Sequence, residues 1–406
     1  MFAGNRKTLT TRHIRASNRF MLLQQLLAAE STNRQELSRL TGLSPATVNN
    51  LVSDLIKRGL VVEVGFEESQ GGRPTTTFSI NPKYGTCIGI DCSETYLHFE
   101  LFDLQLRNLA THEIEITQKH NRPEHIVAYI ADGLETLLAQ NCTPSHSVVG
   151  VGVSIPGPFE HNTGVSVFAP YWGWRDVPIQ RLLEKSVKFP LYLDNPLKFN
   201  AIAEQWLGAG RGIENFVSVF LGTGVGAGIV IDGALFRGSS NSAGEWGHTP
   251  FVYNGRRCRC GSRGCLEAYI GAPGLIQSLR ETAPDSPYLE DTHHSETIRG
   301  LIDGYIRGDP VAQEVCSEYA QMVGAGLATL VNIINPELIV LGSWLAKQIG
   351  PHILSEVQEV VARYALAKSA RATRIVISQF ERSAVSIGGA AVALEKFLDD
   401  AMVAEA

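Results

Sequence analysis

The chain has 406 residues and a net charge of −6, with 44% apolar and 19% charged residues. This composition is that of an ordinary soluble globular protein, and the length predicts two or three domains. The basic N-terminus lacks an apolar core segment, which excludes a secretory signal. The apolar, uncharged stretch over residues 216–231 is too short and too rich in glycine to span a bilayer, so membrane insertion is not expected.

Charge and cysteine are distributed unevenly along the chain. Residues 1–60 contain nine lysines and arginines against three acidic residues, a net charge of +6, so the remainder carries −12. A basic end on an acidic body is typical of a nucleic-acid-binding arm attached to a sensor or an enzyme, although a solvated basic face would give the same balance. The odd total of seven cysteines, without paired spacing, indicates a reducing, cytoplasmic location.

Three helices are predicted in the first 60 residues. Apolar periodicity indicates the first over residues 12–29 and a short second one over residues 33–40, which Ser31 or Thr32 can cap. A third helix is expected over residues 45–58, because Ser44 is a good N-cap and proline occupies the first helical position.

Two short helices joined by a glycine-containing turn, after a longer helix, are typical of a helix-turn-helix. The exposed N-terminal part of the second short helix would enter the major groove of DNA. Small polar side chains there can contact base edges or thymine methyl groups, and asparagine suits adenine. The candidate DNA-binding residues on this helix are Ser44, Ala46, Thr47, Asn49 and Asn50.

A β-hairpin wing is expected next, with strands over residues 60–66 and 75–80. Its loop contains Gly71-Gly72-Arg73-Pro74, which would present Arg73 to the minor groove or to a phosphate. Residues 1–82 are thus predicted to form a winged helix-turn-helix DNA-binding domain. A winged helix used only for protein contacts is the alternative, and the charge distribution favours DNA.

The rest of the chain alternates strands and helices, which predicts an α/β body of two lobes with a mixed sheet in each. Residues 86–91 and 96–102 are expected to form a hairpin, and a strand over residues 189–193 precedes Asp194-Asn195-Pro196. A glycine-rich hairpin is expected over residues 216–231. Its glycines could approach a phosphate or let two backbones cross closely, and both interpretations stay open.

Three of the seven cysteines lie within eight residues, and the first of them comes ten residues after His248. Three cysteines and one histidine suffice to close a tetrahedral Zn²⁺ site of the structural kind. Gly261 and Gly264 would allow the chain to fold back on itself. The predicted zinc ligands are His248, Cys258, Cys260 and Cys265, with buried or free cysteines and a core histidine as the alternative.

Two carboxylates flank the predicted metal ligands, Glu245 before His248 and Glu267 after Cys265. Charged acceptors held rigidly near a fixed imidazole suit a polyhydroxylated ligand. They could equally orient the metal ligands, and the local sequence does not decide between the two roles.

The pattern Glu-x-Gly-His followed by Cys-x-Cys-Gly-x-x-Gly-Cys-x-Glu resembles the signature of the ROK family of sugar kinases, sugar-responsive repressors and uncharacterised open reading frames. The similarity extends from about Tyr84 to the C-terminal region. The segment before it, with its Gly-Gly-Arg-Pro loop, is similar to the winged helix of the repressor branch, a unit that the kinases lack.

The resemblance implies an actin-like ATPase body of the sugar-kinase type. Residues 83–195 would form the first α/β lobe, joined by a C-terminal helix at about 386–406, and residues 196–385 the second lobe with the zinc site. His248 and the three cysteines would bind zinc. Sugar hydroxyls would contact Asn195, Glu245, His248 and Glu267, with His248 using its two ring nitrogens for two roles.

This sequence departs from the family's kinases at three places. The Asp-x-Gly-x-Thr phosphate motif has become Asp91-Cys92-Ser93-Glu94-Thr95, so its glycine is lost and a negative charge stands where phosphate would bind. Pro196 occupies the position of the catalytic base, and Asp194, two residues earlier, would be misplaced as a substitute. Ser343-Trp344 departs from a glycine triplet found near the adenosine. No catalytic residue is therefore assigned.

The expected function is a DNA-binding transcriptional regulator, a repressor of sugar-utilisation genes, that senses a sugar or a sugar phosphate through a catalytically inactive kinase-like body with a structural Zn²⁺. Family members are dimers or tetramers, so a palindromic DNA operator is expected. One alternative is an active sugar kinase with a DNA-binding arm. Another is a regulator controlled by a protein partner such as a sugar transporter.

Overall fold

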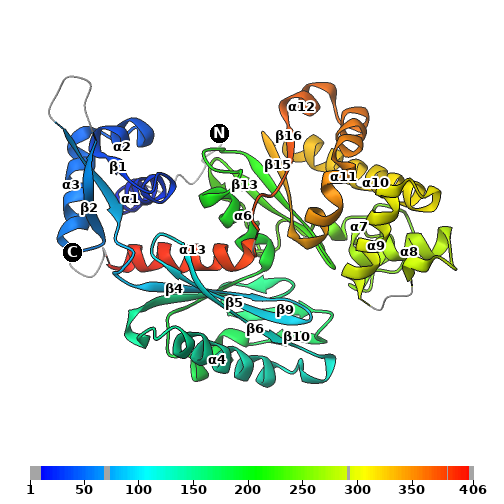
Figure 1. Cartoon of the computed structure of the whole chain (residues 1–406), viewed down its shortest axis with the longest axis horizontal. Coiled ribbons are helices and arrows are strands. Elements are labelled where there is room, and N and C mark those ends of the chain that lie inside the picture. Colours follow the sequence, from blue (N-terminus) through cyan, green and yellow to red (C-terminus); the bar gives the residue numbers. More distant parts are fainter. Residues whose placement is uncertain (1–10, 68–73, 290–292, 382, 402–406) are drawn as a thin grey trace, which may run out of the picture.

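An N-terminal unit of three helices and a small sheet opens the computed structural model of the chain (Figure 1). The structure describes residues 11–67, 74–289, 293–381 and 383–401. The elements of this unit are α1 (Thr11–Ala28), β1 (Thr32–Asn33), α2 (Arg34–Thr41), α3 (Pro45–Lys57), β2 (Val61–Glu67) and β3 (Thr75–Ile80). The strands pair antiparallel in the order β1-β3-β2.

Side-chain caps set where the two short helices begin. Ser44 caps α3 as predicted, because its side chain accepts a hydrogen bond from the Thr47 amide at 3.2 Å. For α2 the predicted cap, Ser31 or Thr32, was wrong. The Asn33 side chain accepts from the Glu36 amide at 2.8 Å instead. Residues 32–33 pair with β3 as strand β1, so the helix begins only after them.

A five-stranded sheet of order β11-β7-β4-β5-β6 forms the first lobe. The elements of this lobe are β4 (Thr86–Cys92), β5 (Tyr96–Asp103), β6 (Asn108–Glu115), α4 (Pro123–Gln140), β7 (Val148–Ser154), β8 (Phe159–Glu160), β9 (Val165–Ala169), β10 (Trp174–Val177), α5 (Ile179–Ser186) and β11 (Leu191–Asp194). Strands β11, β7 and β4 are parallel, and β5 and β6 are antiparallel to their neighbours.

The C-terminal helix α13 (Ala384–Ala401) lies on the face of this sheet opposite α4 (Figure 1). Glycines let it rest directly on the strands. A Cβ atom at Gly89 would lie 1.8 Å from the Ser386 carbonyl oxygen, and one at Gly152 would lie 2.1 Å from the Gly389 oxygen. Any larger residue at either strand position would push the helix off the sheet.

The second lobe is built on a sheet of order β14-β13-β12-β15-β16. Its elements are α6 (Pro196–Leu207), β12 (Phe216–Leu221), β13 (Val225–Ile231), β14 (Ala234–Leu235), α7 (Glu267–Ile270), α8 (Ala272–Thr282), α9 (His294–Arg307), α10 (Pro310–Ile334), β15 (Leu338–Gly342), α11 (Ser343–Tyr364), α12 (Ala367–Ala372) and β16 (Arg374–Ile377). Short 3-10 turns cover Gln118–His120, Ser145–Ser147, Trp246–His248 and Pro287–Leu289. Helices α8 to α11 pack with this sheet into one large apolar core.

Helix α6 follows β11 directly and packs against elements of both lobes. A Cβ atom at Gly226 would lie 2.5 Å from the Leu197 side chain, and one at Gly228 would lie 2.4 Å from both the Ala201 Cβ and the Leu197 carbonyl oxygen. These two glycines of the β12–β13 hairpin therefore serve close packing with α6, one of the two interpretations that the sequence left open.

The winged unit shares its core with the body. Buried residues of α1, α3 and β3 belong to one apolar cluster with residues of α6 and α13. The ring of Tyr84, in the connection to β4, lies 5.9 Å from that of Phe397 on α13. None of the helices in the described ranges combines the length and the apolar surface that a membrane crossing requires.

Candidate functional site

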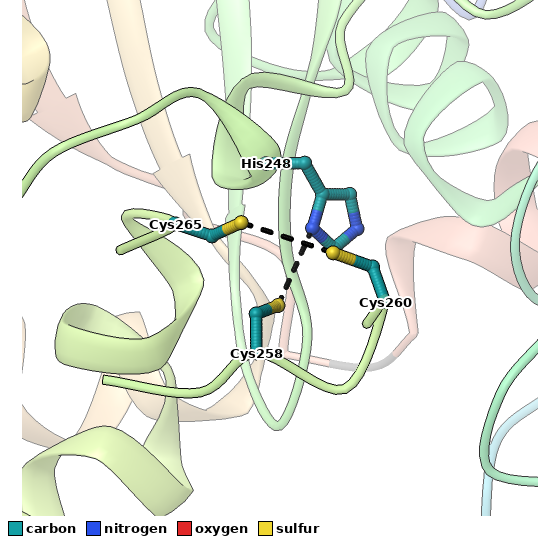
Figure 2. Close-up of side chains that lie close together, drawn as sticks. All are labelled: His248, Cys258, Cys260 and Cys265. Atoms are coloured by element: carbon teal, nitrogen blue, oxygen red, sulfur yellow. Dashed lines mark hydrogen bonds between the residues drawn. The ribbon is translucent and has the colours of Figure 1, made fainter. Parts of the chain in front are cut away.

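Four side chains of the second lobe converge on one point (Figure 2). The ligand atoms of His248, Cys258, Cys260 and Cys265 all lie within 4.8 Å of one another. The Cys258 sulfur is 3.6 Å from His248 Nδ1, and the sulfurs of Cys260 and Cys265 are 3.8 Å apart. A tetrahedral Zn²⁺ with bonds of about 2.3 Å to sulfur places its ligand atoms about 3.8 Å apart, so the four residues fit this ion.

Two glycines shape the loop that carries the cysteines. Gly261 and Gly264 have φ angles of +98° and +74°, in the region that favours glycine. A Cβ atom at Gly264 would also lie 1.7 Å from the Val252 carbonyl oxygen. The chain can therefore turn back tightly between Cys260 and Cys265, as the spacing of the glycines predicts.

A cavity of about 740 Å³ is lined by residues of both lobes. All four predicted sugar contacts line it, namely Asn195, Glu245, His248 and Glu267. Because Nδ1 of His248 faces the Cys258 sulfur while the residue also lines the cavity, the histidine joins the metal cluster to the cleft.

Asn195 and Glu245 both line this cavity, and each has a buried side-chain polar atom. Asn195 caps α6, since its Oδ1 accepts a hydrogen bond from the Lys198 amide at 3.1 Å. Among the described residues, neither Nδ2 of Asn195 nor Oε1 of Glu245 has a hydrogen-bond partner. Buried polar atoms are nearly always satisfied, so a donor and an acceptor without partners indicate a place for a polar ligand.

Glu267 has contacts with both the metal loop and the cleft. Its Oε2 accepts a hydrogen bond from the Val225 amide at 3.0 Å, and its Oε1 lies 3.6 Å from the Cys258 sulfur and 3.5 Å from Arg259 Nε. The carboxylate thus supports a predicted metal ligand while it lines the cavity, which accommodates both roles that the sequence left open.

Pro196 is the first residue of α6 and lines the cavity. The carboxylate of Asp194, the alternative base, instead accepts hydrogen bonds from three other side chains. Its Oδ2 accepts from Arg237 at 2.5 Å and from His161 at 3.2 Å, and its Oδ1 accepts from Asn241 at 3.2 Å. Burial alone would raise the pKa of Asp194, but the hydrogen bonds and charges of His161 and Arg237 outweigh it and lower the pKa. A carboxylate so stabilised is a poor proton acceptor.

An internal ion pair occupies the turn where the family's kinases carry their phosphate motif. Glu94, between β4 and β5, pairs with Arg259, which stands between two of the clustered cysteines. The Glu94 carbonyl oxygen also accepts a hydrogen bond from Trp172 Nε1 at 3.3 Å. The ion pair joins the first lobe to the cysteine loop.

Ser343 has a φ angle of +75° at the start of α11. This left-handed conformation favours glycine, the residue that the family's kinases often have there. Ser343 and Trp344 both contribute side chains to the lining of the cavity.

The candidate DNA-binding residues of α3 lie on its outer face. Ser44, Ala46, Asn49 and Asn50 are exposed, and Thr47 is half-buried with its hydroxyl 2.9 Å from that of Ser44. The buried side of the helix carries Val48, Val52 and Leu55. Arg73 lies outside the described residues.

Sequence reasoning missed the polar network behind the cleft. Lys198 is fully buried and donates to the Ala243 carbonyl oxygen at 2.6 Å. Burial lowers its pKa, while the charges of Glu245 and Asp194 favour its protonated form. Arg237, Asn241 and His161 were also not recognised. The available sequence signal was a lysine in the first turn of the helix that follows Asn195, a predicted sugar contact.

Comparisons with known proteins agree with the geometry. Residues 87–396 match the ROK family, and residues 15–62 match the winged helix-turn-helix DNA-binding family. The xylose repressor of Caldicellulosiruptor bescii is 30% identical over 385 residues, which cover 94% of this chain and 96% of that protein. The glucokinase of Halalkalibacterium halodurans is 33% identical over 279 residues, or 67% of this chain and 84% of the kinase.

A solved ROK family transcriptional regulator, a homologue of the Escherichia coli Mlc protein, has the same fold. It matches with a TM-score of 0.78 and 23% identity, over 97% of this chain and 100% of that one. The winged unit and the kinase-like body therefore occur together, in one order, in both this regulator and the xylose repressor. The chain belongs to the ROK family, in the branch of DNA-binding repressors of sugar utilisation that carry an N-terminal winged helix-turn-helix.

Proposed function

We propose that this repressor binds a palindromic operator as a homodimer or homotetramer and releases or engages it when an uncharged sugar binds between the lobes. The winged unit, residues 1–82, contacts DNA through Ser44, Ala46, Thr47, Asn49 and Asn50 and through Arg73 of the wing. The body comprises the lobes 83–195 and 196–385, with the C-terminal helix on the first. It binds the sugar without phosphorylating it.

The observation that carries the proposal is a pair of buried polar atoms, Asn195 Nδ2 and Glu245 Oε1, that have no hydrogen-bond partner among the residues that the structure describes. An amide donor and a carboxylate acceptor in one cavity are complementary to neighbouring sugar hydroxyls, each of which donates and accepts. His248 and Glu267 line the same cavity and complete the proposed contacts.

The charge of the cleft favours a sugar over a sugar phosphate. Its lining contains seven carboxylates and two strongly basic groups, Arg259 and Lys347. Arg259 is already paired with Glu94 and Glu267. The carboxylates are Asp91, Glu94, Glu100, Glu113, Glu245, Glu267 and Glu381. A phosphate group would meet like charge here, so D-xylose, which the name of a relative suggests, is the first compound to test.

Phosphoryl transfer lacks its base and its phosphate site. Pro196 cannot accept a proton, and the Asp194 carboxylate is already paired with Arg237 and His161. Loss of a general base alone costs about 10²–10⁴ in rate. A sugar kinase with a DNA-binding arm remains the second candidate because of the 33% identity to a glucokinase.

Zn²⁺ is proposed as a structural cofactor of the cleft. His248, Cys258, Cys260 and Cys265 would hold it, and bound zinc would supply a rigid, closed tetrahedral centre. The loop would then hold His248 and Arg259 in place on one side of the cavity.

The test uses the full-length, zinc-loaded protein and genomic fragments selected for binding. D-xylose, D-glucose, N-acetyl-D-glucosamine and D-glucose 6-phosphate are each screened by thermal shift, then by operator affinity. We expect one neutral sugar to raise Tm by a few degrees and to change operator affinity, and the phosphate to do neither. Sugar-dependent ATP turnover at an ordinary enzymatic rate, above about 1 per second, would establish the kinase instead.

A further inference from the structure

The helix that carries Asn195 into the cleft also reaches the DNA-binding unit. Asn195 is the N-cap of α6, and just beyond the end of this helix Arg211 donates a hydrogen bond through Nη1 to the carbonyl oxygen of Ala28 at 3.3 Å. Ala28 is the last residue of α1. A helix of this length spans about 18 Å at 1.5 Å per residue. One short helix therefore has one end at the proposed sugar site and the other at the winged unit.

Packing against α1 and α13 prevents α6 from moving independently of these two helices. Its residues Phe199, Ile202 and Trp206 are buried in the apolar cluster that also contains Leu26 and Leu27 of α1. A Cβ atom at Gly388 of α13 would lie 1.9 Å from the Phe199 carbonyl oxygen, so the two helix backbones touch. Close-packed interiors transmit displacement rather than absorb it.

We propose that α6 transmits the state of the cleft to the winged unit, and that Arg211 is the positioning residue at the receiving end. This inference rests on the proposed function, since it requires a ligand at Asn195. A sugar hydroxyl that bonds Asn195 Nδ2 favours one placement of the α6 N-terminus, and the placement of α1 follows through the shared core and the Arg211 bond. Ligand and operator then select between two arrangements of the same helix.

The chain provides a matched control at the same end of α1. Arg107, in the turn between β5 and β6, places Nη2 3.6 Å from the Glu30 carboxylate. Arg211 and Arg107 are both exposed arginines, and both join the end of α1 to the body. Only Arg211 belongs to the segment that continues from α6. Substitutions at Arg211 and at Arg107 therefore distinguish transmission through α6 from simple attachment of the winged unit to the body.

The experiment measures operator affinity of the full-length, zinc-loaded protein with and without saturating D-xylose, or whichever neutral sugar of the panel stabilises the unmodified protein. For R211A we expect an unchanged operator affinity without sugar and an unchanged thermal shift with sugar. The sugar-induced change in operator affinity should fall by about threefold or more, as the loss of one exposed hydrogen bond predicts. Arg211→Lys should recover part of the change, and R107A should behave like the unmodified protein.

The outcomes distinguish this inference from the proposed function. If no sugar of the panel alters the operator affinity of the unmodified protein, the proposed function fails and the role of α6 fails with it. If the unmodified protein responds and R211A responds equally, only the role of α6 is overturned. Equal losses in R211A and R107A would assign the effect to general attachment of the winged unit and would also overturn it.

Discussion

Two edges of the cleft differ: the proposed sugar side, at Asn195 and Glu245, and the proposed nucleotide side, at Glu94 and Ser343. On the proposed sugar side, Asn195 and Glu245 have buried polar atoms without hydrogen-bond partners in the described part of the chain. On the nucleotide side, Glu94 and Arg259 satisfy each other, and Ser343 keeps the backbone of a glycine while adding a side chain. Under the proposed function, sugar binding and phosphoryl transfer depend on different edges of the same cavity, so one can be lost without the other.

Removal of zinc should have the largest effect, since the metal loop contributes to both sides. Cys260→Ser or chelation should cost about 4 kcal/mol or more and lower Tm by about 10 °C or more, at 2–4 °C per kcal/mol. Sugar response should be lost as well, because His248 loses its fixed position. Calorimetry and zinc analysis check this, with the exposed Cys142→Ser as control. Equal Tm values for C260S and the unmodified protein would rule out a structural metal.

A smaller effect is expected from Asp91 on the nucleotide side. Burial raises the pKa of this carboxyl to about 6 from its ordinary 3.8, although a hydrogen bond from Ser383 and the nearby His98 oppose the rise and the carboxylates of Glu100 and Glu113 add to it. The folded protein therefore holds this proton more tightly than the unfolded chain. Stability due to Asp91 is full below about pH 4 and declines as the pH rises to about 6.

Asp91→Asn, which mimics the protonated form, should therefore stabilise the protein by about 1 kcal/mol at pH 4.5 and by up to about 3 kcal/mol at pH 7.5. Urea unfolding at the two pH values measures the difference. A stabilisation of the same size at both pH values would show that the carboxyl does not titrate in this range.

The most direct comparison of the two sides of the cleft involves the smallest expected change in free energy. Glu245→Gln should weaken binding of the responsive sugar by about 10- to 100-fold, the effect of losing one hydrogen bond to a charged group. Glu381→Gln, an exposed carboxylate of the same cavity, should change it by less than about threefold. Titration calorimetry gives both affinities. Equal losses in the two variants would mean that the ligand lies across the whole cavity.

Local signals predicted much of this molecule because their causes are local. Ser44 followed by proline sets the start of α3 whatever surrounds it, and glycines at 261 and 264 allow the turn that clusters the cysteines. Prediction failed where the partner was distant in sequence. Strand β1 displaced the cap of α2 because it pairs with β3, more than 40 residues later. Helix α11 and the four-residue strand β16 were not recognised, since neither has a distinctive boundary signal.

The sequence by itself determined the winged helix-turn-helix, the cluster of one histidine and three cysteines, and the proline that opens α6, because each depends on residue type and spacing within a short segment. Only the tertiary structure decided that Arg259 forms an ion pair with Glu94 and that Arg237 and His161 donate hydrogen bonds to the Asp194 carboxylate. It also decided that α6 joins the cleft to the winged unit. Those pairings join residues tens to hundreds of positions apart. Which of many charged and apolar groups meet is decided by the packing of the whole chain rather than by any local preference.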